Sequence, residues 1–114
     1  MYNKENRIRL RRGRSALIQA PLVYSDGSAL ELESGDVVRF AVRSGADGEL
    51  LINKTMVQAD GKASLELAPS DTSSLELGHY YYDIGIDFSD GTFYDLVEWT
   101  GFDLLPSASQ DGGA

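Results

Sequence analysis

The stretch that most constrains the fold of this chain is His79 to Phe88, with the sequence HYYYDIGIDF. Large apolar side chains occupy every second position, and most residues between them are polar or small. The apolar set is Tyr80, Tyr82, Ile84, Ile86 and Phe88. A period of two predicts a β-strand with one buried face and one solvent face. Ser89-Asp90-Gly91 then supplies turn residues, which predicts a hairpin.

The same turn signal recurs along the chain. Asp-Gly pairs begin at Asp26, Asp47, Asp60 and Asp90, each between apolar-rich runs. No helical periodicity is available for crossover connections, so successive hairpins predict an all-β, antiparallel fold. The expected strands are 7–11, 15–23, 36–43, 50–56, 62–67, 79–88 and 92–104, with one helical turn within 69–74.

Two local features refine this expectation. Leu75 to Tyr80 has the sequence of a tyrosine corner, in which we expect the Tyr80 hydroxyl to bond to backbone between Pro69 and Gly78. The last strand changes phase near Val97 and again at Gly101, which predicts β-bulges that let it serve both sheets. On the strand 50–56, the expected buried face holds Leu50, Ile52 and Met56.

The length of 114 residues predicts a single domain. We expect a basic N-terminal arm or edge strand at 1–13, a β-sandwich at 14–105 and a flexible tail at 106–114. The chain has no cysteine, which excludes a disulfide framework and a thiolate metal site. No apolar run is long enough to span a membrane, and the N-terminus lacks the apolar core of a signal peptide, so we expect synthesis in a cytoplasm.

The net charge of −8 is distributed unevenly. Residues 1–14 hold six basic side chains and one acidic, a net +5, whereas residues 15–114 hold four basic and seventeen acidic, a net −13. Nucleic acid is not expected as a partner, because the acidic body would repel it. The arm instead predicts contact with an acidic face, either of its own domain or of a neighbouring copy. The predicted contact residues are Arg7, Ile8, Arg9, Leu10, Arg11 and Arg12.

No residue pattern predicts catalysis. His79 is the only histidine and falls on the polar face of its strand, without a nucleophile motif to partner it. Asp83, Asp87 and Asp95 could cluster across the hairpin, but we interpret them as a solvated acidic face. The run from Asp87 to Gly91 is rich in oxygen ligands yet lacks the full ligand series of a calcium loop. We therefore expect no enzyme activity, no metal and no cofactor.

Aromatic residues offer a second kind of site. Six aromatic residues fall within twenty positions: Tyr80, Tyr81, Tyr82, Phe93, Tyr94 and Trp99. Alternation buries Tyr80 and Tyr82 and exposes Tyr81, and one of the pair Phe93 and Tyr94 must also face outward. Exposed rings stack on sugars or fill a partner's pocket. A carbohydrate-binding module is therefore an alternative function, and it predicts a co-planar set of exposed rings.

Part of the chain resembles a known family. The residues that carry the resemblance are Gly35-Asp36-Val-Val-Arg-Phe40, Asp71-Thr72, Leu75, Gly78-His-Tyr80-Tyr-Tyr82-Asp83-Ile84, Asp90-Gly91, Leu96 and Gly101-Phe102. Together they resemble the small immunoglobulin-like domain at the N-terminus of siphophage upper baseplate proteins and related phage structural proteins.

The resemblance implies an immunoglobulin-like antiparallel β-sandwich of about seven to eight strands. It also implies a non-enzymatic virion component of the baseplate, tail or capsid, made in the host bacterial cytoplasm. Its expected partners are other phage structural proteins and copies of itself. Assembly of this kind predicts an ordered N-terminal arm and a large buried interface.

Overall fold

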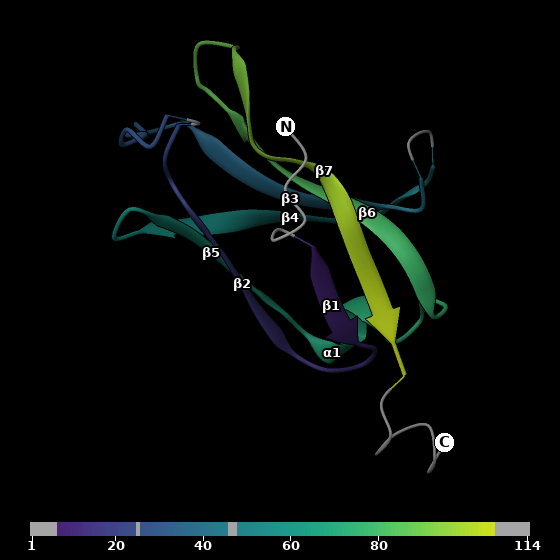
Figure 1. Cartoon of the computed structure of the whole chain (residues 1–114). Coiled ribbons are helices and arrows are strands. Elements are labelled where there is room, and N and C mark those ends of the chain that lie inside the picture. The colour runs from purple at the N-terminus through teal and green to yellow at the C-terminus, as the bar shows by residue number, and fades with distance from the viewer. Residues whose placement is uncertain (1–6, 25, 46–47, 107–114) are drawn as a thin grey trace.

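The computed structural model describes residues 7–24, 26–45 and 48–106 (Figure 1). These residues form seven strands and one helical turn, which confirms the predicted all-β class. The elements are β1 (Ile8–Arg11), β2 (Ala16–Pro21), β3 (Val37–Arg43), β4 (Leu50–Ala59), β5 (Lys62–Leu67), α1 (Pro69–Thr72), β6 (Gly78–Asp87) and β7 (Phe93–Leu105). No helix in this part of the chain is long and apolar enough to cross a membrane.

The strands follow the order β1-β7-β6-β3-β4-β5-β2. The long strand β4 takes part in two layers, because Met56 pairs with Val38 on β3 while Val57 pairs with Ser64 on β5. One layer therefore holds β1, β7, β6, β3 and most of β4, and the other holds β2, β5 and the end of β4 (Figure 1). The seven strands thus form one mixed sheet that folds over into two layers, a sandwich-like arrangement.

Three details differ from the prediction. Strand β1 pairs with β7 in parallel, with Ile8 opposite Phe102. Because β1 and β7 are the first and last strands, no hairpin turn fixes their relative direction. In addition, β4 and not β7 is the strand shared by the two layers. The β6–β7 register does shift beside Val97, as predicted, but the pairing of Gly101 with Tyr81 is regular, so the bulge expected at Gly101 was wrong.

The core lies between the layers and is filled by the alternating apolar positions. Phe40 of β3, Tyr82 of β6 and Phe102 of β7 are buried, and their ring centroids lie 5.5 to 6.4 Å apart. Tyr82 and Phe102 meet nearly edge to face, an arrangement that aromatic quadrupoles favour. Leu50, predicted to be buried with Ile52 and Met56, is instead exposed. The register of β3 and β4 shifts between Val42 and Arg43, which takes Leu50 out of the buried series.

The Asp-Gly turns take the expected positions where the structure describes them. Asp60 and Gly61 both have positive φ, 55° and 75°, and they connect β4 to β5 with only two residues. Positive φ at both central positions defines a type I′ turn, whose twist matches that of the flanking strands. Asp26 and Asp90 build a second kind of turn, in which Oδ1 accepts hydrogen bonds from the backbone and hydroxyl of the residue two places later. Asp47 lies outside the described residues.

The connection from β5 to β6 contains α1, which matches the helical turn predicted within 69–74. After it, the hydroxyl of Tyr80 donates to the backbone oxygen of Glu76 at 2.6 Å, the hydrogen bond expected of a tyrosine corner. The Tyr80 side chain is half-buried rather than fully buried. Residues 107–114 of the predicted tail lie outside the described residues.

Candidate protein-interaction surface

The six residues predicted to bind a partner form or flank β1, and the structure divides them by role. Ile8 and Leu10 are half-buried and pack against the core of their own domain. Their strand hydrogen-bonds to β7 of the same chain, with Leu10 opposite Leu104. The edge strand expected from alternation is therefore present, and it extends the domain's own sheet.

Arg7 holds β1 to the domain through Asp103. Its Nε and Nη2 atoms donate to Oδ2 and Oδ1 of Asp103 at 2.8 and 3.0 Å, a bidentate ion pair. Nδ1 of His79 lies 2.7 Å from the same Oδ1, and the Asp103 side chain is only 6% exposed. Burial by itself raises the pKa of Asp103, but the hydrogen bonds from Arg7 and His79 outweigh it and hold the pKa below its usual value.

Sequence reasoning missed Asp103. The signal was its position as a single acidic residue within the apolar run Gly101-Phe-Asp-Leu-Leu105. A charge in such a run requires a partner, because an unpaired buried carboxylate is costly. Gly101 contributes as well: a Cβ atom there would collide with the guanidinium of Arg7, so glycine leaves the space that Arg7 occupies.

The other arginines of the arm differ in what they contact. Nη1 of Arg12 donates to the backbone oxygen of Leu75 at 3.2 Å, which ties the end of β1 to the loop before β6. Arg9 and Arg11 point outward from β1, are exposed, and form no ion pair or hydrogen bond with side chains in the described part of the chain. Of the six predicted residues, Arg9 and Arg11 are thus the ones that face solvent with their charges unengaged.

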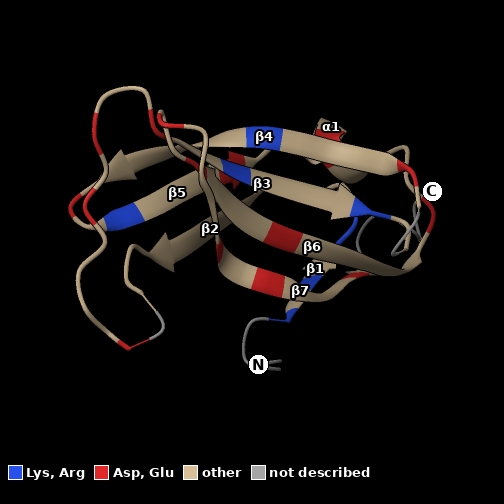
Figure 2. Cartoon of the chain, turned by 90° about the horizontal axis from the view of Figure 1, so that it is seen from above, with Lys and Arg blue, Asp and Glu red and all other residues tan. Residues whose placement is uncertain are grey.

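Acidic side chains gather at another end of the molecule. We call the loops that join β2 to β3, β4 to β5 and β6 to β7 the acidic end, because hydrogen bonds from Leu22 to Gly61 and from Ser89 to Asp36 connect them. The acidic residues of these loops are Asp26, Glu31, Glu33, Asp36, Asp60 and Asp90. Figure 2 shows acidic residues concentrated on the loops at that end, while β1 carries basic residues away from it. Asp36 joins two of these loops, because its carboxylate accepts hydrogen bonds from the backbone N–H groups of Glu33 and Ser89. These bonds lower the pKa of Asp36, which keeps it ionised.

Two of the exposed aromatic residues in the described part of the chain, Tyr81 and Trp99, contact each other. Tyr81 is 38% exposed, as predicted, and Phe93 is the exposed member of its pair at 60%. The ring of Tyr81 stacks on that of Trp99, with centroids 4.9 Å apart and planes 10° apart. Each ring therefore covers one face of the other.

The carboxylates that were candidates for a catalytic cluster, Asp83, Asp87 and Asp95, have different surroundings. Asp83 is half-buried, and burial together with repulsion from Asp95 raises its pKa, an effect that Arg43 partly offsets. Asp87 instead pairs with Arg39, at 2.8 Å between Nε and Oδ2. His79 has an exposed side chain and contacts Asp103, as described above. Among the described residues, no three acidic or histidine side chains are grouped so as to hold a metal ion.

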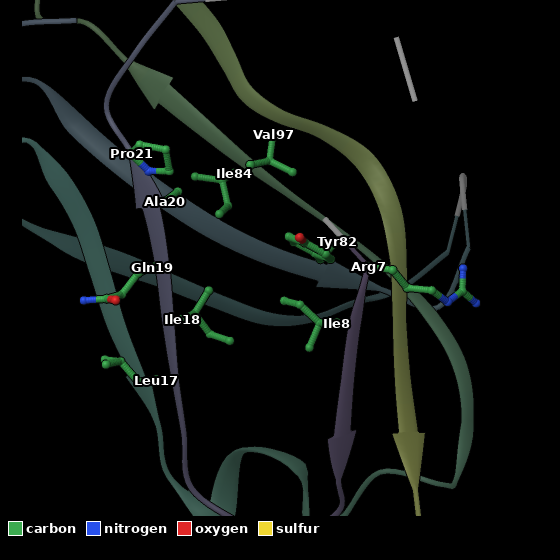
Figure 3. A pocket seen from close by; sticks show the side chains of 10 residues that line it. All are labelled: Arg7, Ile8, Leu17, Ile18, Gln19, Ala20, Pro21, Tyr82, Ile84 and Val97. Carbon is green, nitrogen blue, oxygen red and sulfur yellow. The ribbon is translucent and has the colours of Figure 1, made fainter. Parts of the chain in front are cut away.

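A groove lies between the two edge strands, β1 of one layer and β2 of the other, which do not pair with each other. It has a volume of about 250 Å³ and lies between β1 and β2, with β6 and β7 behind it (Figure 3). Its lining is mostly aliphatic: Arg7, Ile8, Leu17, Ile18, Gln19, Ala20, Pro21, Tyr82, Ile84 and Val97. Ile8 and Ile18 face one another across it, whereas the guanidinium of Arg7 points away. We call this feature the seam groove.

No protein-family model matches this chain, and no curated protein matches it.

Proposed function

We propose that this protein is a non-enzymatic structural protein of a phage virion and acts by assembling with other proteins and with copies of itself. The resemblance of residues 35–105 to phage immunoglobulin-like domains supports the virion assignment. The observation that carries the assembly role is the separation of charge: exposed Arg9 and Arg11 on β1, and the acidic end elsewhere on the same molecule.

This separation favours a head-to-tail contact. The arginines of one copy are complementary to the acidic end of the next, and two different surfaces meeting in this way generate rings or open filaments. The contact does not need a strand exchanged between copies, because Ile8 and Leu10 are already committed to their own sheet. The partner-facing part of the arm is thereby reduced to Arg9 and Arg11.

Charge reversal tests the assembly role. Arg9→Glu and Arg11→Glu should each abolish the oligomers that light scattering detects for the unaltered protein at low salt. The matched controls are Arg9→Lys and Arg11→Lys, which keep the positive charge at the same exposed positions of β1. They should leave assembly intact. Raising the salt to about 0.5 M should dissociate the unaltered oligomers, because exposed charges are screened over a few ångströms at that concentration.

A protein that is monomeric at low salt, or that assembles equally well with Arg9→Glu and Arg11→Glu, would overturn the assembly role. Deletion of the whole arm is a poorer test, since it also removes β1 and leaves Asp103 without Arg7. The virion assignment has its own test, which is detection of the chain by mass spectrometry in purified particles.

A further inference from the structure

The layer that contains β2 lacks a strand that immunoglobulin-type sandwiches commonly have. In those sandwiches the first strand lies beside the second, in the same sheet. Here β1 pairs with β7 in the opposite layer, so β2 is the last strand of its own layer. Within the described residues, nothing pairs with the outer side of β2.

The backbone of β2 is correctly oriented to accept such a strand. Leu22 donates its N–H to the oxygen of Gly61, on the side of β5, at 2.9 Å. Since backbone groups alternate in direction along an antiparallel strand, the N–H and C=O groups of Leu17 and Gln19 point to the open side. Pro21 ends the strand and has no N–H to leave unpaired there.

The residues of this edge carry no charge that would prevent pairing. Residues 15–25 are the longest stretch of the chain without Asp, Glu, Lys or Arg, and Leu17 within it is 63% exposed. Natural edge strands usually carry charged side chains that discourage pairing with another chain. Strand β1 follows that rule, with Arg9 and Arg11, whereas β2 does not.

The seam groove lies directly beside this edge. Ile18 and Ala20 line it from β2, Ile8 lines it from β1, and Ile84 and Val97 line it from behind (Figure 3). A strand added to β2 would turn every second side chain over this groove. The groove therefore favours apolar side chains at those positions.

We propose that the open edge of β2 and the seam groove bind an extended segment of a different protein by strand addition. That segment is uncharged and carries apolar side chains at alternate positions. The chain's own remaining segments do not fit this description. Residues 1–6, MYNKEN, include Lys4 and Glu5, and residues 107–114, SASQDGGA, contain no large apolar side chain. The inference rests on the proposed role in protein assembly and identifies a second contact with different chemistry.

The probe is the capped peptide Thr-Val-Thr-Ile-Thr-Val-Thr, titrated into the full chain and followed by the backbone amide resonances. Binding should shift the amides of Leu17 and Gln19 and slow their hydrogen exchange. Gln19→Pro removes an outward N–H that has no internal partner, so it should weaken binding by about tenfold or more. Gln19→Ala keeps the N–H and is the matched control, which should bind as the unaltered chain does.

A control on the peptide avoids any effect of substitution on folding. The same peptide N-methylated at alternate residues, on the side that faces β2, should not bind the unaltered chain. Binding should also be insensitive to salt and to Arg9→Glu, which separates this contact from the charge-driven assembly. If the peptide does not bind, the proposed assembly through Arg9 and Arg11 is unaffected. If Arg9→Glu does not change assembly, the proposed strand addition is unaffected.

Three results would overturn the proposal. The first is equal binding of the methylated and unmethylated peptides, or no binding of either. The second is slow exchange of the Leu17 and Gln19 amides in the free monomer, which would mean that the chain fills its own edge. The third is an oligomer that Gln19→Pro dissociates but Gln19→Ala does not, which would make a second copy the occupant.

Discussion

The guanidinium of Arg7 and the carboxylate of Asp103 form a bidentate ion pair between residues 96 positions apart in the chain. Asp103 is almost fully buried, while the Arg7 side chain is 38% exposed. The pair fixes β1, the first strand, to β7, the last. It therefore adds a side-chain contact to the parallel backbone pairing of these two strands.

Replacing Arg7 should destabilise the protein because it leaves the buried carboxylate of Asp103 with His79 as its remaining side-chain partner. We expect Arg7→Ala to lower the free energy of unfolding by about 2 kcal/mol, below the usual cost of breaking a fully buried pair because Arg7 is partly exposed. Arg9→Ala, on the same strand but exposed, is the control and should change stability little. Urea denaturation of both variants provides the measurement, and equal stabilities would contradict the importance of the pair.

The Asp103 carboxylate should also make stability depend on acidity. Its pKa is lowered in the folded state, so its contribution is complete above the unfolded value of about 3.9 and is lost as pH falls through the folded value. Asp103→Asn removes this contribution. The unaltered protein should therefore exceed Asp103→Asn in unfolding free energy at neutral pH, and the gap should shrink below about pH 4. A gap that stays constant across the acid range would show that Asp103 is not the titrating group.

The tyrosine corner should contribute one hydrogen bond of stability. Tyr80→Phe removes the hydroxyl that donates to Glu76 and leaves the ring in place. The expected loss is about 1 kcal/mol, the usual net value of such a bond. Thermal denaturation with a fitted unfolding enthalpy measures it. An unchanged melting temperature would contradict this contribution and mean that water replaces the Tyr80 hydroxyl as the donor to the Glu76 carbonyl oxygen at no cost.

The type I′ turn should be sensitive to a side chain at its second position. Gly61 has a φ of 75°, a conformation that residues with a Cβ atom rarely adopt. Gly61→Ala should therefore cost about 1 kcal/mol of stability. Gly45→Ala is the control, because Gly45 does not have a positive φ and a Cβ there would meet no atom within 4 Å. If both substitutions had the same effect, backbone strain at Gly61 would not be the cause.

Much of the local structure could be predicted from the sequence. Alternation in β6, the Asp-Gly turns, the helical turn α1 and the hydrogen bond of Tyr80 all depend on residues close together in the chain. Their physical causes are local: side chains alternate along a strand, and glycine accepts positive φ. The same alternation predicted the exposure of Tyr81 and the charged outer face of β1.

Features that join distant segments were decided only by the tertiary structure. Sequence periodicity does not specify which strand pairs with β1, and both the parallel pairing with β7 and the ion pair of Arg7 with Asp103 join opposite ends of the described chain. The exposure of Leu50 depends on a register shift between two strands, which a single strand's pattern does not encode. The open edge of β2 has the same origin. The sequence shows that β2 is uncharged. It does not show that β2 lacks a neighbouring strand, because this depends on the long-range packing of β1 against β7.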